Sequence, residues 1–528
     1  MVASASTKAV TVLCVEVADP DIMDQWLQLG WMPNLARLRS EGLWTRLESV
    51  AEISSGAIWP TFFTGADPSE HGQFFTHMQF RPGTYEIVKM YADDVPYEPF
   101  WLELQHSGYT CAIIDVPQTL PLKYFNGIHI TGWGGEYPAW PQSSSPAPLI
   151  KEVNRRFGNH PLANKYRVAI KPESLKEYDC LTRDLLHGAQ MKAALSRWVF
   201  DKGPYDFFMT VFSEPHWAMH LLWDLLDETH PNRPQEKFIK YAEVFRELFG
   251  IIDRSIGELR NARPEADLLV FSFSGMGPNY SGWHILPEVL ARIGMGSPGE
   301  HKGLGRLFSP IQRWGPWKTR AVERIVSPRV IEAAKAIVPG RFWDRWTRRF
   351  LHASNGWRQS RAFCVPNDYS GAIRINLEGR EPRGTVKAGG EYQRVCDDIS
   401  QALLELKHLK TGRPVVKEVV QTHRTYEGGN LETLPDLLVL WANESPVTDV
   451  ASPRVGEIMQ ESPERRTGAH RPWGFFAAAG PQIRSNVNLK NIHLLDLAPT
   501  ILSLLGVTPS AYYKGRVISE LMANKNEE

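Results

Sequence analysis

The chain has 528 residues, and its 59 basic (Lys and Arg) and 59 acidic (Asp and Glu) side chains give a formal net charge of zero at pH 7. This balance excludes a protein that binds polyanions through its overall charge, so no nucleic-acid partner is expected, and 43% apolar residues exclude a disordered chain. No apolar run reaches the roughly 18–20 residues that cross a bilayer, so no membrane span is expected. The segment before Val10 lacks the apolar core of a signal sequence, which predicts an unprocessed, cytoplasmic protein.

Strands and helices alternate from the beginning of the chain. The run Val10–Val17 is apolar without alternation, which is typical of a parallel strand covered on both faces. Helices are expected at Asp21–Leu29 and Pro33–Ser40, because Pro33 suits a first helical turn and Gly42 a C-terminal cap. The alternation continues through Trp101–His106, Thr110–Val116, Asp206–Phe212, the long helix around Lys237–Leu259, and Asp267–Phe273. It predicts an α/β fold, with a doubly wound, mostly parallel sheet and helices on both faces.

Two segments interrupt this alternation and suggest the domain organisation. Gly134–Pro148 is rich in Gly, Pro and Ser and leads into a mostly helical, cap-like insertion at about 134–200. Residues 299–361 are strongly basic and aromatic, with helical patches. We therefore expect a discontinuous core over 8–298 and 362–520, interrupted by the 299–361 insertion. That insertion is interpreted as a solvated arm, a subunit-contact arm of a homo-oligomer, or a patch for anionic partners.

Three histidines stand out by their positions. His216 and His220 follow the strand predicted to end at Phe212, and Pro215 marks the start of a helix. Their i,i+4 spacing puts both imidazoles on one helical face, as in a zinc-protease helix, although the Glu of that motif is absent. His470 lies in a loop with Gly and Pro, before an apolar strand. From the residues alone, both metal binding and an ordinary surface location stay open for these histidines.

Several sequence blocks, taken in order, give the chain a family resemblance. The blocks are Ala18–Asp21, Met32–Leu38, Trp59–Gly72, Phe271–Pro278, Gly468–Gly474 and Asp496–Gly506. Together they resemble the type I phosphodiesterase/nucleotide pyrophosphatase branch of the alkaline phosphatase superfamily. The resemblance implies an alkaline-phosphatase-like fold and a hydrolase that typically holds two metal ions around a Ser or Thr nucleophile.

The resemblance also assigns roles to individual residues. It implies that the ligands of the first metal are His216, His220 and His470, and that the nucleophile position is Ser55. Thr76 occupies a position from which the family often holds the oxyanion, so it is a candidate for substrate binding.

The positions of the second metal depart from the family pattern. They fall on Glu16, on Ser55, and on Phe273 and Ser274, where the family has an Asp-His pair. Phe273 cannot bind a metal, and Ser274 is a poor zinc ligand compared with histidine, so we expect this second site to be empty. Asn279 follows closely and is a further candidate for substrate binding.

The first metal position also differs from the family pattern, but it keeps three side chains that can bind a metal. His216 stands where the family has a carboxylate, which gives three neutral imidazoles around a single zinc ion. A tris-His zinc with an open position is a known catalytic arrangement. Two mechanisms stay open: Ser55 attacks with Glu16 as its base, or water activated by the metal attacks and Ser55 only hydrogen-bonds the substrate. Glu214 is a candidate partner that fixes an imidazole tautomer.

The sequence thus predicts a metal-dependent hydrolase or transferase with a single tris-His zinc. Its expected substrate is a phosphate-type ester or a related small anionic metabolite. Two alternatives stay open, a mononuclear zinc enzyme with non-phosphoryl chemistry and a catalytically degenerate metal-binding protein.

Overall fold

The chain forms two compact units in a computed structural model. The larger unit comprises Met1–His71, Tyr91–Asn279 and Arg465–Glu528, and the smaller unit comprises Gly72–Met90 and Tyr280–Glu464. The structure describes residues 8–75, 78–89, 95–134, 142–163, 171–296, 356–485, 487 and 489–523. The basic insertion predicted at 299–361 therefore lies almost wholly outside the described residues.

A mixed sheet forms the centre of the larger unit, and nine of its strands lie in the described residues. In spatial order they are β20 (Ile492–His493), β2 (Leu43–Glu48), β19 (Trp473–Ala479), β9 (Asp267–Phe271), β1 (Val10–Val15), β8 (Phe207–Phe212), β5 (Cys111–Ile114), β6 (Gly127–Thr131) and β7 (Ser143–Ser145). The run from β9 to β6 is parallel throughout, whereas β19 and β7 pair antiparallel with their neighbours. The predicted mostly parallel sheet is confirmed.

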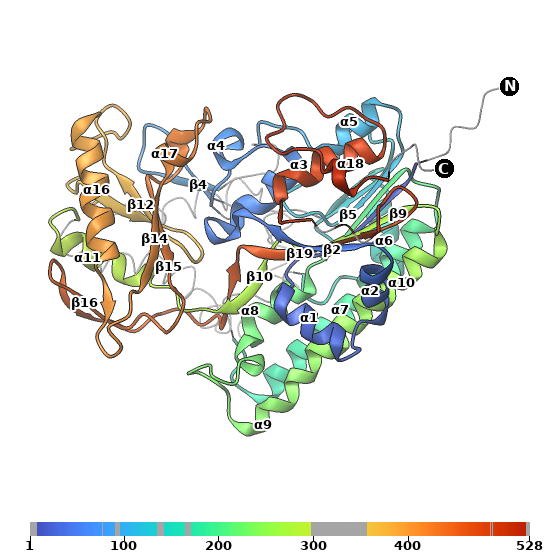
Figure 1. Ribbon diagram of the computed structural model, residues 1–528, viewed down its shortest axis with the longest axis horizontal. Helices are drawn as coiled ribbons and strands as arrows, with labels where there is room; N and C mark the ends of the chain where they lie inside the picture. Colours follow the sequence, from blue (N-terminus) through green and yellow to red (C-terminus); the bar gives the residue numbers. More distant parts are fainter. Residues whose placement is uncertain are drawn as a thin grey trace, which may run out of the picture. The chain divides into compact units, whose positions relative to one another are not determined.

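Helices cover both faces of this sheet (Figure 1). In β1, Val10, Val12 and Cys14 belong to the hydrophobic cluster on one face, and Leu13 and Val15 belong to the cluster on the other. The first face packs against α3 (Ile58–Thr64), α5 (Trp101–His106) and α18 (Leu497–Leu504). The second packs against α1 (Pro20–Gln28), α2 (Pro33–Glu41), α6 (Leu149–Phe157), α7 (Leu175–Phe200), α8 (Glu214–Leu226) and α10 (Glu243–Ala262). Burial on both sides explains why the strands are continuously apolar.

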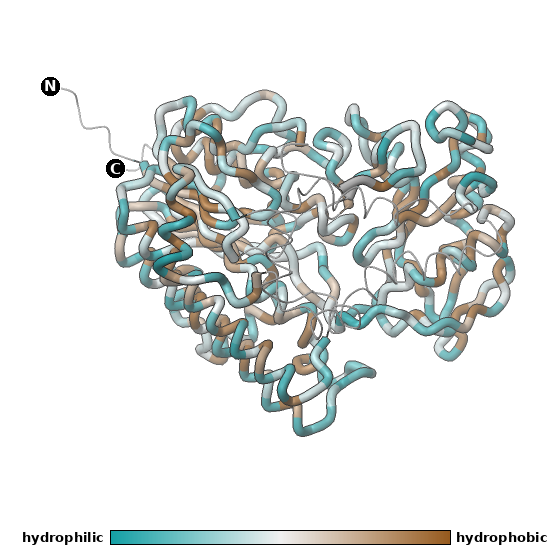
Figure 2. Tube along the Cα trace, turned by 180° about the vertical axis from the view of Figure 1, so that it is seen from behind, coloured by the Kyte–Doolittle hydropathy of each residue, from teal (hydrophilic) through white to brown (hydrophobic). Residues whose placement is uncertain are grey.

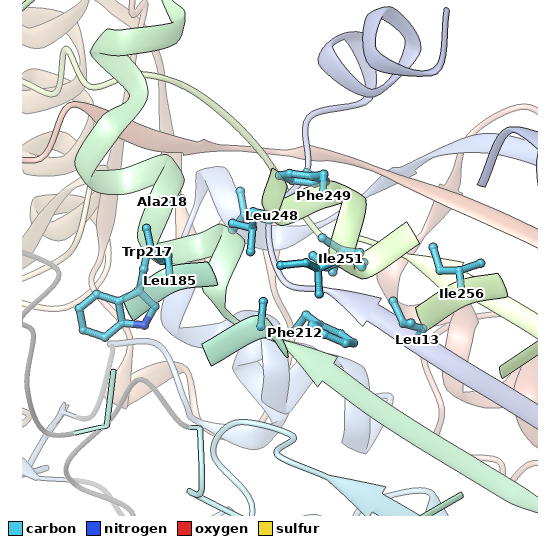
Figure 3. Packing of buried hydrophobic residues seen from close by; sticks show 14 of the residues in the cluster. Leu13, Leu185, Phe212, Trp217, Ala218, Leu248, Phe249, Ile251 and Ile256 are labelled. Carbon is cyan, nitrogen blue, oxygen red and sulfur yellow. The ribbon is translucent and has the colours of Figure 1, made fainter. Parts of the chain in front are cut away.

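The long helix predicted around Lys237–Leu259 is divided in the structure. A short helix, α9 (Glu236–Ile239), and a 3-10 turn at Lys240–Ala242 precede α10. The apolar face of α10 packs on the sheet, and Figure 3 shows its side chains together with Leu13 of β1 and Phe212 of β8.

An antiparallel sheet organises the smaller unit. Four of its strands run in the order β11 (Ala362–Val365), β12 (Gly371–Ile375), β15 (Leu437–Trp441) and β14 (Val416–Gln421). Helices α11 (Leu286–Arg292) and α16 (Gly390–Leu404) share a buried cluster with these strands. The predicted boundaries differ from this division, because they group 362–464 with the core, whereas these residues fold with Tyr280–Gly296. In each unit hydrophobic stretches are found mainly in the interior, and the outer segments are mostly hydrophilic (Figure 2).

The remaining described elements are short. They are α4 (Pro68–His71), β3 (Met78–Phe80), β4 (Ile87–Lys89), β10 (Gly275–Pro278), β13 (Lys407–His408), α17 (Thr422–Thr425), β16 (Asp449–Ser452), β17 (Gly456–Met459) and β18 (Gly468–Arg471). No helix in the described part of the chain has both the length and the apolar character needed to cross a bilayer.

Gly42 ends α2 as predicted, and its backbone N–H donates to the carbonyl oxygen of Leu38. A Cβ at this position would lie far inside the van der Waals distance of the carbonyl oxygen of Ala478 in β19.

We therefore expect Gly42→Ala to lower the free energy of unfolding by about 2–3 kcal/mol, measured by urea denaturation. Gly250→Ala in α10 is the control, because an added Cβ there would meet only the end of Arg254, at 3.7 Å, and alanine favours a helix. Equal losses in the two variants would contradict the role of close packing.

Candidate metal centre

Three buried imidazoles meet at one edge of the large sheet. His216 and His220 lie on the first two turns of α8, which begins directly after β8, and His470 lies on β18. β18 is placed by antiparallel pairing with β10, in which His470 is opposite Met276. The three side chains can hold one metal ion, since each offers a nitrogen within 4.8 Å of the other two.

The Nε2 atoms of the three rings point toward one another. His216 Nε2 lies 2.7 Å from His220 Nε2 and 3.1 Å from His470 Nε2. All three residues are at most 7% exposed. The helical spacing therefore brings the pair on α8 together as predicted, and the sheet adds the third histidine.

The opposite ring nitrogens face oxygen atoms. His220 Nδ1 lies 3.0 Å from the carbonyl oxygen of Gly468, and His470 Nδ1 lies 3.0 Å from the hydroxyl of Ser274. His216 Nδ1 lies 3.5 Å from Glu16 Oε1. A carbonyl only accepts hydrogen bonds, so Nδ1 of His220 carries the proton and its Nε2 presents a lone pair when the ring is neutral.

This donor set fits a zinc-type cation. Burial and the neighbouring His216 and His470 lower the pKa of His220 well below its ordinary value, so this ring is neutral near pH 7. A cation bound between the three rings would accept a lone pair from each Nε2 atom. Oxygen partners on the opposite nitrogens are the usual way in which metal-binding histidines are oriented.

Glu16 is buried at the carboxyl end of β1, beside His216. Its Oε1 also accepts a hydrogen bond of 3.2 Å from Trp59 Nε1 in α3. Burial opposes ionisation of Glu16, but the adjacent His216 and hydrogen bonds from His216, Ser213 and Trp59 outweigh it and lower the pKa. Glu16 Oε2 is buried and has no hydrogen-bond partner among the described residues. Glu16 therefore lies beside the outer ring nitrogen of His216 and has a second, buried carboxylate oxygen.

Aromatic packing surrounds the position of the second metal. The ring centroid of Phe273 lies 4.9 Å from those of Trp59 and Phe62, and 5.1 Å from that of Phe271. Ser274 contacts a ring nitrogen of His470, so its hydroxyl supports the first metal position. These contacts leave an apolar wall where a second cation would need anionic ligands.

The remaining candidates for catalysis and substrate binding are Ser55, Asn279 and Thr76. Ser55 is half-buried and begins the 3-10 turn Ser55–Ala57 directly before α3, the helix whose Trp59 contacts Glu16. Asn279 follows β10, and its side-chain amide donates to the carbonyl oxygen of Arg466, at 3.2 Å. Thr76 lies outside the described residues. The catalytic and substrate-binding roles of these residues stay predictions.

Glu214 contacts a fourth histidine. Its Oε1 accepts a hydrogen bond from His160 Nε2, at 2.9 Å, whereas Glu16 Oε1 lies 3.5 Å from His216 Nδ1. His160 was not singled out from the sequence, because it lies in a loop far from the motif residues and carries no spacing signal.

Comparisons with known proteins agree with this architecture. The sequence pattern described as type I phosphodiesterase / nucleotide pyrophosphatase matches residues 10–464. Phosphonoacetate hydrolase from Sinorhizobium meliloti 1021, solved with phosphonoformate, is similar in structure, with a TM-score of 0.50, 10% identity and coverage of 95% of this chain and 96% of that one. Human ectonucleotide pyrophosphatase / phosphodiesterase 5 gives a TM-score of 0.45 and 12% identity over 98% of this chain and all of that one. No curated protein matches in sequence.

Metal analysis of the purified protein should return about one ion per chain, because the described residues contain one group of three converging ligands. His220→Ala removes one ligand and should weaken metal binding at least tenfold. Inductively coupled plasma mass spectrometry measures the stoichiometry. Two ions per wild-type chain would contradict the account of Phe273 and Ser274.

Proposed function

This chain belongs to the type I phosphodiesterase / nucleotide pyrophosphatase family of the alkaline phosphatase superfamily, and we propose that it hydrolyses phosphate-type esters with a single zinc ion. The ligands are His216, His220 and His470. The observation that carries the proposal is the convergence of three buried Nε2 atoms whose rings are oriented from behind by oxygen partners. The family supports the reaction class, and the ligand set supports one metal.

Zinc at this site supplies a Lewis acid for the phosphoryl oxygens. In the proposed mechanism, the Ser55 oxygen bonds to phosphorus while the bond from phosphorus to the ester oxygen breaks, and the leaving oxygen takes a proton to become the alcohol. Water then attacks phosphorus, which breaks the bond to Ser55 and restores the serine hydroxyl. Glu16 Oε2 accepts the proton of the attacking hydroxyl. Trp59 and Phe273 pack edge-to-face and make this side of the site apolar. The N-terminal end of α3 favours negative charge developing near Ser55.

The activity is tested with zinc-loaded protein on bis(p-nitrophenyl) phosphate, a diester, and p-nitrophenyl phosphate, a monoester. We expect turnover that falls about 1,000-fold in His220→Ala, through loss of the metal. Ser55→Ala should fall by a similar factor if serine is the nucleophile, and Glu16→Gln by about 100-fold as the base.

The outcomes separate the competing functions. Fully metal-loaded protein without turnover of either ester would contradict the proposal and favour a degenerate metal-binding protein. Phosphonoacetate belongs in the same assay, because a protein with this fold is described as its hydrolase. Activity in Ser55→Ala close to that of wild type would exclude the serine pathway and favour direct attack by water.

The double substitution Phe273→Asp with Ser274→His restores the family's Asp-His pair. We expect it to raise the metal content from about one to about two ions per chain and to increase diester turnover, because two metals stabilise both the attacking and the leaving oxygen. Phe273→Ala is the matched control, since it opens the same space without adding a ligand. A folded double variant that still holds one ion would show that the apolar wall is not what excludes the second metal.

The proposal also includes the expected partners and the location of the protein. They are a small anionic substrate, a homo-oligomer formed through the 299–361 insertion, and a cytoplasmic location.

A further inference from the structure

A second buried polar contact lies behind the helix that carries two metal ligands. The side chains of His160 and Glu214 are 0% and 1% exposed, and their Nε2 and Oε1 atoms are 2.9 Å apart. We propose that His160 is a positioning residue for the metal centre, because its hydrogen bond to Glu214 fixes the first turn of α8 and so places His216 and His220. This inference rests on the part of the proposed function that assigns these histidines to the metal.

The hydrogen bond between His160 and Glu214 does not require a protonated, positively charged imidazole. The backbone N–H of Leu162 donates to His160 Nδ1, at 3.4 Å, so Nδ1 is an acceptor and Nε2 carries the ring proton. A neutral imidazole thus donates to the carboxylate of Glu214.

His160 is itself held in one place. Its ring packs edge-on against Trp133, with centroids 5.3 Å apart. Trp133 is fixed by two hydrogen bonds, from its backbone N–H to Asp115 Oδ1, at 2.8 Å, and from Nε1 to the carbonyl oxygen of Gly158, at 3.1 Å. On the other side, Gly188 of α7 leaves the room that the ring needs, since a Cβ there would lie 2.7 Å from His160 Cε1. These contacts hold the ring of His160 in place, so its Nε2 donor does not move with α8 if that helix shifts.

Glu214 and the metal ligands face different sides of α8. Glu214 is the first residue of the helix, and His216, two residues later, is turned by about 200° around the helix axis. His216 is held on its own side by Glu16, at 3.5 Å. Trp217 and Ala218 belong to the large buried cluster, together with Leu185 of α7, as Figure 3 shows. The contacts of Glu214 with His160 and of His216 with Glu16 lie on opposite sides of α8, so together they fix how the first turn is rotated about the helix axis. The packing of Trp217 and Ala218 fixes how closely this part of the helix approaches the buried cluster.

Loss of His160 would leave a buried carboxylate without its described partner. Glu214 Oε2 already has no hydrogen-bond partner among the described residues, so Oε1 carries the recorded contact. An unsatisfied buried carboxylate is costly, and one way to relieve that cost is for the first turn to shift toward water. Such a shift moves His216 and His220 with it.

The test is the zinc dissociation constant, measured by competition with a chelator on the full chain. We expect His160→Ala and Glu214→Ala each to weaken zinc binding about tenfold, and the double variant to be no weaker than either single variant. His160→Gln keeps a side-chain N–H donor and should recover most of the affinity. His129→Ala is the matched control, because it also removes a fully buried imidazole that packs edge-on against a tryptophan, Trp101, and it should change affinity less than twofold.

The outcomes discriminate positioning from a general structural role. Equal losses of thermal stability in His160→Ala and His129→Ala, with zinc affinity unchanged in both, would overturn the proposal. Additive losses in the double variant would also overturn it, since they would mean that the two residues act separately. If His160→Ala does not fold, Glu214→Ala and His160→Gln still decide it. Wild-type protein that binds zinc without turnover would remove the hydrolase function and leave this inference standing, whereas wild-type protein that binds no metal would overturn both.

Discussion

The metal centre depends on one electrostatic constraint, the mutual approach of three imidazole nitrogens. At 2.7 and 3.1 Å, His216 Nε2 is as close to its two neighbours as a hydrogen-bonded pair. In neutral His220 the ring proton faces a backbone carbonyl on the far side, so its Nε2 offers a lone pair to a proton on His216 or to a bound cation. A cation between the rings would take a lone pair from each Nε2 atom, which is the arrangement that we propose for this cluster. The parallel sheet supplies the positions, because β8 leads directly into α8, and β10 aligns the strand that carries His470.

Packing supports the proposal that the second metal position is lost. In a pocket lined by Trp59, Phe62 and Phe271, the ring of Phe273 gains the burial that a large aromatic side chain favours. An Asp at the same position would be buried without its cation, at considerable cost. The hydroxyl of Ser274 is small enough to contact His470 without competing for the metal. The two departures from the family pattern thus support each other, one by filling the space and the other by orienting a ligand of the remaining site.

The sequence predicted the parts of the fold that depend on local pattern. Continuous apolar runs gave β1, β5 and β8, and the i,i+4 spacing gave the pair of histidines on α8. The family resemblance was needed for His470, because a single histidine has no periodic signal, and a loop was expected where the structure has the short strand β18. The division into units was not predicted, since it depends on which distant strands pair, as β12 and β15 do. Glu16 was predicted to be in the site, but its contact with Nδ1 of His216 depends on side-chain geometry at the end of a strand.

His160 shows why such supporting residues escape sequence analysis. Its role depends on four separate conditions: an acceptor at Glu214, a backbone donor at Leu162, an aromatic wall at Trp133, and the missing side chain of Gly188. Among these residues only Glu214 lies near the metal ligands in the sequence, and the sequence does not show that its partner is His160. The ligands of a metal centre can be recognised by type and spacing, because the metal restricts both. The residues that hold the ligands in place are restricted only by the fold, so they become visible only when the folded structure shows which groups are buried together.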